Sequence, residues 1–490
     1  MPSRQRAKPA VAQLAKCLTG ITGLDELTGG GLPLGRPTLV CGSAGCGKTL
    51  LAMQFLVNGA LDYGEPGVFV SFEESPKELA ENVASLGFDL KRMVRRKQIW
   101  LEHIQMDNSR PLETGEYNLE GLFIRLGYAI TAIGAKRVVL DTLEALFAYL
   151  PNRELVRSEL HRLFVWLKAR GVTAVVTAER GDGALTRYGM EEYVADCVIL
   201  LDHRVIEQIS TRRLRVVKYR GSLHGTNEYP FLFGRRGLSV LPITSLGLDH
   251  PVETARISSG VAGLDAMLDG KGYYRGSSIL ISGATGTGKG SLAVSMVAAA
   301  CQRGEQCLYF SFEESRDQIV RNMHSIGIDL APHLRSGRLE FHIGRPTVFG
   351  LERHLVTMYD AVNEAKPALV VIDPITEFLS VGSLMDVRAT LTRLADFLKT
   401  QGITAVLTNL TASSDAQPDL SLSSLVDASI QLLHLEAGRQ RRRGLYILKA
   451  RGMPHAQDVR EYWLTDQGVT VAAPEGGPNA AVDSALHAAR

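Results

Sequence analysis

Residues 42–49 read GSAGCGKT, which fits the phosphate-binding pattern G-x-x-x-x-G-K-[ST]. The apolar run TLVC, which predicts a strand, ends just before them, and LLAMQFLVNGALDYG, which predicts an amphipathic helix, follows. In that context the glycines let successive backbone N–H groups face a phosphate, and the start of the helix adds its positive end. We therefore expect a nucleotide-binding loop that comprises Gly42, Ser43, Ala44, Gly45, Cys46, Gly47, Lys48, Thr49 and Leu50.

The side chains of this loop also predict the cofactors, ATP and Mg²⁺. A lysine at the position of Lys48 reaches the β- and γ-phosphates, and a hydroxyl at the position of Thr49 ligates Mg²⁺. Asp141 ends the apolar run RVVLD, where an acid holds the water shell of the metal.

The chain repeats these features in its second half. VSFEES, RVVLD and VVKYRGSLH in the first half return in the same order as FSFEES, ALVVID and ILKARGMPH. Solenoid repeats have periods of about 20–50 residues, so this much longer period indicates the tandem duplication of a whole domain. The predicted parts are an N-terminal tail at 1–14, a first domain at 15–243, a linker at 244–255, a second domain at 256–470 and a C-terminal tail at 471–490.

The second copy of the loop departs from the pattern at one position. Lys289 is kept and Asp373 supplies the second acid, but Gly290 stands where the first copy has the metal-ligating hydroxyl. Ser291 comes one residue late, and one helical step turns a side chain by roughly 100°. We expect nucleotide binding with a weaker or differently arranged metal, through Gly283, Ala284, Thr285, Gly286, Thr287, Gly288, Lys289 and Gly290.

Each half alternates short apolar runs with amphipathic helical stretches, which predicts an α/β fold with a mainly parallel sheet between helices. The runs DCVILLDHRV and RRLRVVKYRG, separated by a polar turn, predict a hairpin appended to the first sheet.

Paired carboxylates follow the second apolar run of each half, Glu73-Glu74 and Glu313-Glu314. A carboxylate there polarises a water or a hydroxyl for attack on the γ-phosphate. An ordinary acidic helix start is the alternative for one copy, but the repetition of the pair at the same distance from the loop favours catalysis.

Four basic residues lie on late strands, far in sequence from their own loops: Lys218, Arg220, Lys449 and Arg451. Such side chains suit an arginine-finger role on the nucleotide of a neighbouring subunit. Solvated strand charges are the alternative.

Together these motifs resemble the KaiC family of cyanobacterial circadian clock proteins. The resemblance rests on the GITGLDELTGGGL entry, the paired loops, the F-E-E-S segments and the K-x-R-G segments, and covers roughly residues 15–470. It implies two tandem RecA-like P-loop NTPase domains in a double-ring homo-hexamer with ATP at the subunit interfaces. It also implies an ATPase in the N-terminal ring and an autokinase and autophosphatase in the C-terminal ring. Glu73 and Glu313 would be the catalytic glutamates.

The resemblance further points to phosphorylation sites. The family's Ser-Thr pair precedes the Asp of a T-D-T-I-I-L-L-like strand by three residues, and LSLSSLVDASIQLL places Ser423 and Ser424 there. This Ser-Ser pair, Pro418 in place of a family threonine, and Ile326 in place of the aromatic residue beside the adenine are departures. They fit a divergent, non-cyanobacterial member.

The partners follow from the same comparison and from composition. The resemblance allows a KaiB-like partner at the first domain, whereas the short C-terminal tail speaks against a KaiA-like one. The net charge of +2 gives no electrostatic case for nucleic acid or an anionic membrane, and no apolar run reaches the roughly 20 residues of a bilayer span. Six cysteines without a C-x-x-C pair indicate neither a disulfide framework nor a zinc site, so we expect a cytoplasmic protein.

Two alternatives to the ATPase and serine autokinase remain open. A RecA-like DNA-dependent motor or recombinase shares the fold, but it should show a basic DNA-facing channel. A nucleotide-binding scaffold with a kinase-impaired second domain is favoured by Gly290.

Overall fold

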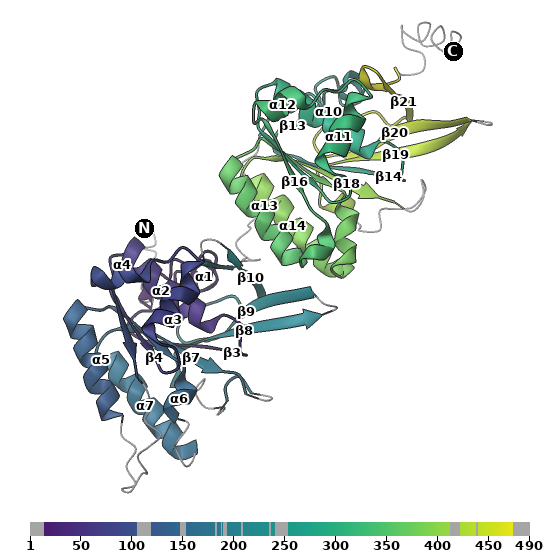
Figure 1. Cartoon of the computed structure of the whole chain (residues 1–490). Helices are drawn as coiled ribbons and strands as arrows, with labels where there is room; N and C mark the ends of the chain where they lie inside the picture. The colour runs from purple at the N-terminus through teal and green to yellow at the C-terminus, as the bar shows by residue number, and fades with distance from the viewer. Residues whose placement is uncertain are drawn as a thin grey trace, which may run out of the picture. The chain divides into compact units, whose positions relative to one another are not determined.

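A computed structural model of the chain divides into two compact units, residues 1–245 and 246–490, and each is described by itself (Figure 1). Among the helices in the described part of the chain, none combines the length and apolar character that a bilayer crossing requires. The structure describes residues 14–104, 119–147, 153–181, 184–187, 189, 194–206, 209–234, 237–240, 253–411, 422–437 and 440–473.

The first unit is built on a nine-stranded sheet. Six neighbouring strands are parallel: β8, β3, β7, β6, β4 and β5. The strands β9, β10 and β11 continue the sheet beyond β8 in antiparallel pairing. The predicted hairpin is therefore confirmed as β8–β9. In spatial order the strands are β11 (Gly237–Val240), β10 (Tyr229–Gly234), β9 (Ile209–Tyr219), β8 (Cys197–Ile206), β3 (Pro37–Gly42), β7 (Thr173–Glu179), β6 (Arg137–Asp141), β4 (Gly67–Ser71) and β5 (Ile99–His103).

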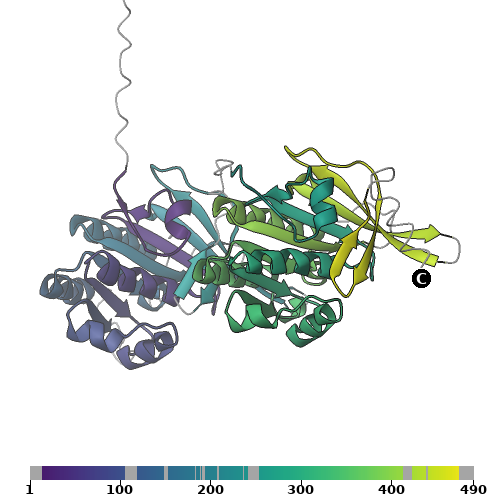
Figure 2. The ribbon, with the colours of Figure 1, turned by 90° about the horizontal axis from the view of Figure 1, so that it is seen from above.

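Helices cover both faces of this sheet (Figures 1 and 2). Alternate residues of β3 show the division: Val40 packs with α2 in one core, whereas Leu39 and Cys41 pack with α5 and α7 in the other. A short sheet of β1 (Lys16–Cys17) and β2 (Leu32–Pro33) precedes β3. The helices are α1 (Leu24–Leu27), α2 (Lys48–Asp62), α3 (Pro76–Ala84), α4 (Leu90–Arg95), α5 (Glu120–Ile133), α6 (Leu143–Phe147) and α7 (Arg153–Ala169).

The second unit repeats this plan, which confirms the predicted duplication of an α/β fold. Its sheet again continues from parallel strands, β16 to β19, into antiparallel ones. In spatial order the strands are β16 (Leu339–Ile343), β15 (Cys307–Ser311), β17 (Leu369–Asp373), β18 (Thr404–Leu410), β14 (Ser278–Gly283), β19 (Ala428–Ala437), β20 (Gln440–Ala450), β21 (Arg460–Thr465) and β22 (Gly468–Val471).

Most of the remaining elements of the second unit have counterparts among the described residues of the first. A short sheet of β12 (Arg256–Ile257) and β13 (Tyr273–Tyr274) precedes β14. The α-helices are α9 (Ala262–Met267), α10 (Lys289–Gln302), α11 (Arg316–His324), α12 (Ala331–Arg335), α13 (Leu351–Ala365) and α14 (Leu384–Thr400), with 3₁₀ turns η1 (Pro346–Val348), η2 (Ile375–Ser380) and η3 (Leu422–Ser424).

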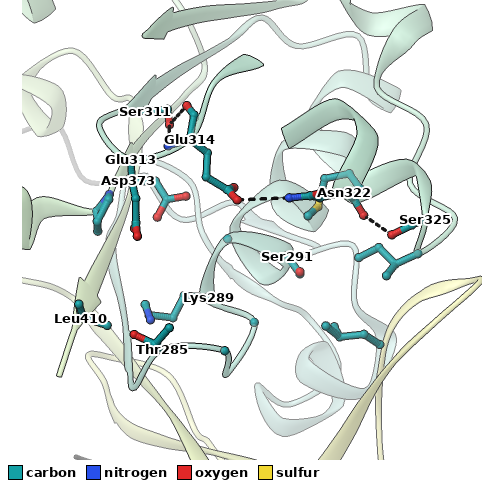
Figure 3. A pocket seen from close by; sticks show the side chains of 17 residues that line it. Thr285, Lys289, Ser291, Ser311, Glu313, Glu314, Asn322, Ser325, Asp373 and Leu410 are labelled. Carbon is teal, nitrogen blue, oxygen red and sulfur yellow. Dashed lines mark hydrogen bonds between the residues drawn. The ribbon is translucent and has the colours of Figure 1, made fainter. Parts of the chain in front are cut away.

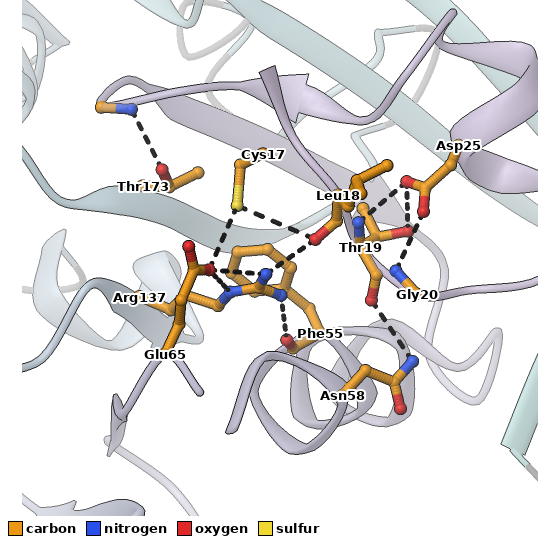
Figure 4. A network of polar contacts seen from close by, with 11 residues as sticks. Cys17, Leu18, Thr19, Gly20, Asp25, Phe55, Asn58, Glu65, Arg137 and Thr173 are labelled. Carbon is orange, nitrogen blue, oxygen red and sulfur yellow. Dashed lines mark hydrogen bonds and ion pairs between the residues drawn. The ribbon is translucent and has the colours of Figure 1, made fainter. Parts of the chain in front are cut away.

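A buried arginine joins α2 to the start of β6 in the first unit (Figure 4). The Arg137 side chain is 1% exposed, and its guanidinium lies 2.7 Å from Glu65 Oε2. It also donates 2.8 Å hydrogen bonds to the carbonyls of Phe55 and Leu18, and it stacks over the Phe55 ring. Because every donor of a buried cation needs an acceptor, this network fixes α2, and the loop that begins it, against the sheet.

Candidate nucleotide-binding sites

The first predicted loop connects the end of β3 to the start of α2. Gly45 and Gly47 take φ angles of 73° and 105°, in the left-handed region that side chains disfavour. Lys48, the first residue of α2, is 9% exposed, and its ammonium donates to the carbonyls of Gly42 (2.9 Å) and Ser43 (3.0 Å). The loop is thus a closed backbone turn at a helix N-terminus, the arrangement that binds phosphate.

The predicted metal residues of the first unit meet each other. Thr49 Oγ1 donates a 3.0 Å hydrogen bond to Asp141 Oδ2 at the end of β6. Thr177, on the neighbouring strand β7, donates to the other carboxylate oxygen. Burial raises the pKa of Asp141, and the hydrogen bonds from Thr177 and Thr49 act in the opposite direction. A hydroxyl and a carboxylate at one point are the oxygen ligands that suit Mg²⁺, so these residues fit that ion.

The second loop has the same backbone form. Gly286 and Gly288 take φ angles of 79° and 92°, and Lys289 donates 3.0 Å hydrogen bonds to the carbonyls of Gly283 and Ala284. Burial lowers the pKa of Lys289, which the charges of Asp373 and Glu313 oppose. Asp373 and Glu313 thus lie within electrostatic range of Lys289.

A pocket of about 390 Å³ opens beside this second loop (Figure 3). Ile326, which stands where the family pattern has an aromatic residue, lines it. In Figure 3 the P-loop residues and Asp373 lie at one side and Ser325 at the other. The lining residues are Thr285, Gly286, Gly288, Lys289, Gly290, Ser291, Ser311, Glu313, Glu314, Asn322, Met323, Ser325, Ile326, Asp373, Pro374, Leu410 and Leu464.

The metal residues of the second unit do not match those of the first. Gly290 brings no hydroxyl to Asp373, and Figure 3 shows Ser291 on the side of α10 toward Ser325, away from Asp373. Instead Tyr309, on β15, donates to Asp373 Oδ2 and Thr408, on β18, donates to Oδ1. These residues lack the P-loop hydroxyl ligand of Mg²⁺, so the fit seen in the first unit is not repeated.

The carboxylate pairs lie where β4 and β15 lead into helices. Each pair is followed by a serine that caps the helix in a capping box, Ser75 with Glu78 on α3 and Ser315 with Gln318 on α11. The residues that cap the two helices are therefore those that follow each glutamate pair. The paired glutamates themselves lie before the helices begin.

The two members of each pair have different surroundings. Glu74 accepts a 3.1 Å hydrogen bond from Asn82, and Glu314 accepts one of 3.2 Å from Asn322. Burial and nearby carboxylates, Asp141 for Glu74, raise the pKa of both second members. The asparagines hold Glu74 and Glu314 in place beside the exposed first members.

The side chain of Glu313 reaches the pocket. Figure 3 shows it beside Asp373 and above Lys289, whereas Glu314 extends toward Asn322. Glu73 is the exposed first member of the other pair, two residues after the end of β4. In the second unit, Glu313 is therefore the member of the pair that lies nearer to the phosphate-binding loop.

The late basic residues contact the turn that carries the predicted phosphorylation sites. Lys449, on β20, donates to the carbonyls of Ser423 (2.7 Å) and Val426 (2.8 Å). Arg451 donates to the carbonyl of Ser424 at 2.8 Å. Ser423 and Ser424 form the end of η3, just before β19. Pro418 lies outside the described residues.

In the first unit, one of the two corresponding residues lies near an acid. Arg220 lies 4.0 Å from Asp196, which also pairs with Lys168 at 2.6 Å. Lys218 is on β9, opposite Val198 of β8. Leu50, at the end of the predicted loop, packs against the core around α2.

Sequence reasoning missed Tyr309, Thr177, Thr408 and the two asparagines. The signal for Tyr309 was a difference between the copies, since CLYFS in β15 stands where β4 has GVFVS. The threonines and the asparagines belong to no sequence motif. Strand register brings the threonines to the aspartates, and the helices α3 and α11 bring the asparagines to the glutamates.

Comparisons with known proteins show the family of the chain. The family model described as "ATPase: KaiC" matches residues 17–245 and again residues 257–476. The circadian clock protein KaiC2 of Synechocystis sp. is 55% identical over 460 residues, which cover 93% of this chain and 81% of that protein. The circadian clock protein KaiC3 of the same organism is 38% identical (94% and 92% covered), and the circadian clock oscillator protein KaiC of Synechococcus elongatus is 36% identical (93% and 88% covered).

Proposed function

The chain belongs to the KaiC family of ATPases, with two RecA-like domains in tandem, and on that premise we propose that its first domain hydrolyses ATP and its second domain phosphorylates its own serines. Both reactions take place at the interfaces of a hexamer. The phosphorylated and unphosphorylated forms constitute the two states of a signalling or timing switch.

The complete set of residues around Thr49 and Asp141 supports hydrolysis in the first domain. Thr49 Oγ1 and Asp141 Oδ2 lie 3.0 Å apart beside the loop, so the hydroxyl and the carboxylate that suit Mg²⁺ meet at one point. Lys48 would hold the β- and γ-phosphates, and Glu73 would take a proton from the attacking water. Mg²⁺, when bound, neutralises charge that develops on the phosphates.

The turn η3 and the Glu313 carboxylate support transfer in the second domain. The oxygen of Ser423 or Ser424 would attack the γ-phosphorus of ATP held by the Lys289 of a neighbouring subunit. The bond between the γ-phosphorus and the bridging oxygen breaks, ADP leaves, and the hydroxyl proton passes to Glu313. Attack by water on the phosphoserine would return the serine and release phosphate.

The assembly is part of the same proposal. Lys218, Arg220, Lys449 and Arg451 would reach the nucleotide of the adjacent subunit, where cations stabilise the transferring phosphate. The relatives are named as circadian clock proteins, which is the context for a KaiB-like partner at the first domain.

The observation that carries the proposal is the Thr49–Asp141 pair beside a complete P-loop. Incubation of the full chain with γ-labelled ATP, followed by peptide mapping, tests it. We expect labelled phosphate at Ser423 or Ser424, lost in Glu313→Gln, together with released phosphate that persists in Ser423→Ala/Ser424→Ala. Release of phosphate without any phosphoserine would remove the kinase and keep the ATPase.

A nucleotide-binding scaffold is the second candidate, and Gly290 favours it. Without the P-loop hydroxyl the second domain would bind ATP and contribute to assembly without transferring phosphate. Equal binding of ATP by wild type and Glu313→Gln, with unmodified serines in both, would establish this candidate.

A further inference from the structure

Two matched positions differ together between the domains. The first is the end of the P-loop, Thr49 against Gly290. The second is the middle of the following strand, where β4 has Phe69 and β15 has Tyr309. Strand register confirms this second match, because Phe69 pairs with the residue two before Asp141 on β6, and Tyr309 pairs with the residue two before the corresponding acid on β17.

The hydrogen bonds show what the two exchanges do together. Asp141 Oδ2 accepts from Thr49 of the P-loop, and Asp373 Oδ2 accepts from Tyr309 of the sheet. The other oxygen of each acid accepts from a threonine at the same place in the sheet. Only the source of the hydroxyl at Oδ2 has therefore changed, from the P-loop to a buried strand of the sheet.

The surroundings of Tyr309 fix its side chain in this position. Its side chain is 1% exposed and packs in the core of the second unit, with its ring centroid 5.2 Å from that of Phe341. The surrounding core therefore holds the ring in place, with its hydroxyl on Asp373.

Gly290 keeps side-chain atoms away from the Asp373 carboxylate on the P-loop side. A Cβ at position 290 would lie 3.3 Å from Asp373 Oδ2 and 4.0 Å from the Tyr309 hydroxyl. A threonine there would bring a second hydroxyl toward an oxygen that already accepts from Tyr309. The glycine and the tyrosine are thus complementary.

We infer that Tyr309 replaces the P-loop hydroxyl as the partner of Asp373, so that the second domain binds ATP with little dependence on Mg²⁺. The nucleotide is held by the loop backbone and Lys289, and the residue that couples the loop to the metal in the first domain is missing. This inference deepens the proposed function, since it rests on ATP binding by the second domain.

The test compares the two sites in the full chain with a non-hydrolysable ATP analogue, adenylyl imidodiphosphate. Lys48→Ala removes the first site and reports the second, and Lys289→Ala does the converse. We expect the dissociation constant of the first site to rise by about tenfold or more when EDTA replaces excess MgCl₂, and that of the second site by less than about threefold.

Exchanging the matched residues sharpens the test. In the Lys48→Ala chain, Gly290→Thr/Tyr309→Phe should raise the magnesium dependence of binding to about tenfold. Gly290→Thr alone and Tyr309→Phe alone should leave it low, because the first keeps the competing phenol and the second adds no ligand. In the Lys289→Ala chain, Thr49→Gly/Phe69→Tyr should lower the dependence of the first site.

Three results would overturn the inference: strong magnesium dependence at the second site, full dependence restored by Gly290→Thr alone, or no binding of the analogue in the Lys48→Ala chain. Thermal unfolding of each variant shows whether the fold is kept, and Thr49→Gly/Phe69→Tyr in the Lys289→Ala chain decides the question if the double variant of the second site unfolds. Phosphoserine is measured separately. Its absence would contradict the kinase proposal while leaving the magnesium result to decide this one.

Discussion

The Thr49 hydroxyl donates a 3.0 Å hydrogen bond to Asp141 Oδ2, across a separation of 92 residues in the sequence. The bond joins the phosphate-binding loop to the end of a central strand. The loop and the acid at the metal position are therefore directly connected.

Glu73→Gln should leave ATP bound and lower its turnover by at least about tenfold, or about 1.4 kcal/mol of barrier. An amide keeps the shape of the carboxylate but does not accept a proton from water. Phosphate release in steady state measures the change, and Glu313→Gln is the matched control, with a small effect expected. The assignment of the two domains is reversed if Glu313→Gln is the variant that loses turnover.

ATP should hold the hexamer together, because it adds charge-assisted contacts that only the assembly makes. Light scattering is expected to give a hexamer with ATP and smaller species after its removal. Lys218→Ala/Lys449→Ala should weaken the assembly at equal ATP concentration. A monomer at micromolar concentration with saturating ATP contradicts the ring and the contacts across its interfaces.

Lys449→Met should loosen the turn that carries the two serines. The ammonium donates to the carbonyls of Ser423 and Val426, and hydrogen bonds to charged groups contribute about 1.5 to 3 kcal/mol. Because Lys449 is partly exposed, we expect a loss of about 1 kcal/mol in the unfolding free energy of the second domain, and less phosphoserine. Hydrogen exchange of residues 422–426 locates the effect, and unchanged exchange there would refute it.

Asp427 should contribute stability that acid removes. Burial alone would raise the pKa of Asp427, but the hydrogen bond from the Ser278 backbone and the Lys399 ammonium at 2.9 Å hold it below its ordinary value. A lowered folded-state pKa gives stability that is present above the unfolded-state value, about 3.9, and is lost as the pH falls through the folded one.

Asp427→Asn measures that contribution. The difference in melting temperature between wild type and the variant should be largest near neutral pH and shrink below about pH 4. A difference that stays constant over this range would show that the charge of Asp427 contributes no pH dependence.

Arg137→Met should destabilise the first domain by about 3 kcal/mol, because it leaves Glu65 and two buried carbonyls without their donor. Calorimetry of the full chain should show a lower transition for one domain only. Leu369→Met is the matched control, since Leu369 begins β17 as Arg137 begins β6, and a volume-conserving apolar change costs less than about 1.5 kcal/mol. Equal effects of both substitutions would contradict the role of the arginine network.

The fold was largely predictable because its signals are local and repeated. A glycine-rich loop between an apolar run and a helix occurs twice, and strands that alternate with helices favour parallel pairing. The order of the strands was not predictable, since the positions of β7 between β3 and β6 and of β18 between β14 and β17 follow from the packing of crossover helices.

The site was predictable where a motif carries the chemistry, as at Lys48, Thr49 and Asp141. It was not predictable where tertiary register decides the partner. Tyr309 and Asp373 are 64 residues apart, and the apolar pattern of β15 does not indicate that the Tyr309 hydroxyl donates to Asp373. Arg137 was equally hidden, as the first letter of the run RVVLD.

Lys449 and Arg451 anchor the Ser423-Ser424 turn by hydrogen bonds to main-chain carbonyl oxygens, which every amino acid possesses. Lys449 and Arg451 would hold the same turn if its residues were alanine, threonine or aspartate. The proposed phosphate acceptors can therefore be exchanged between serine and threonine without the loss of these two anchors.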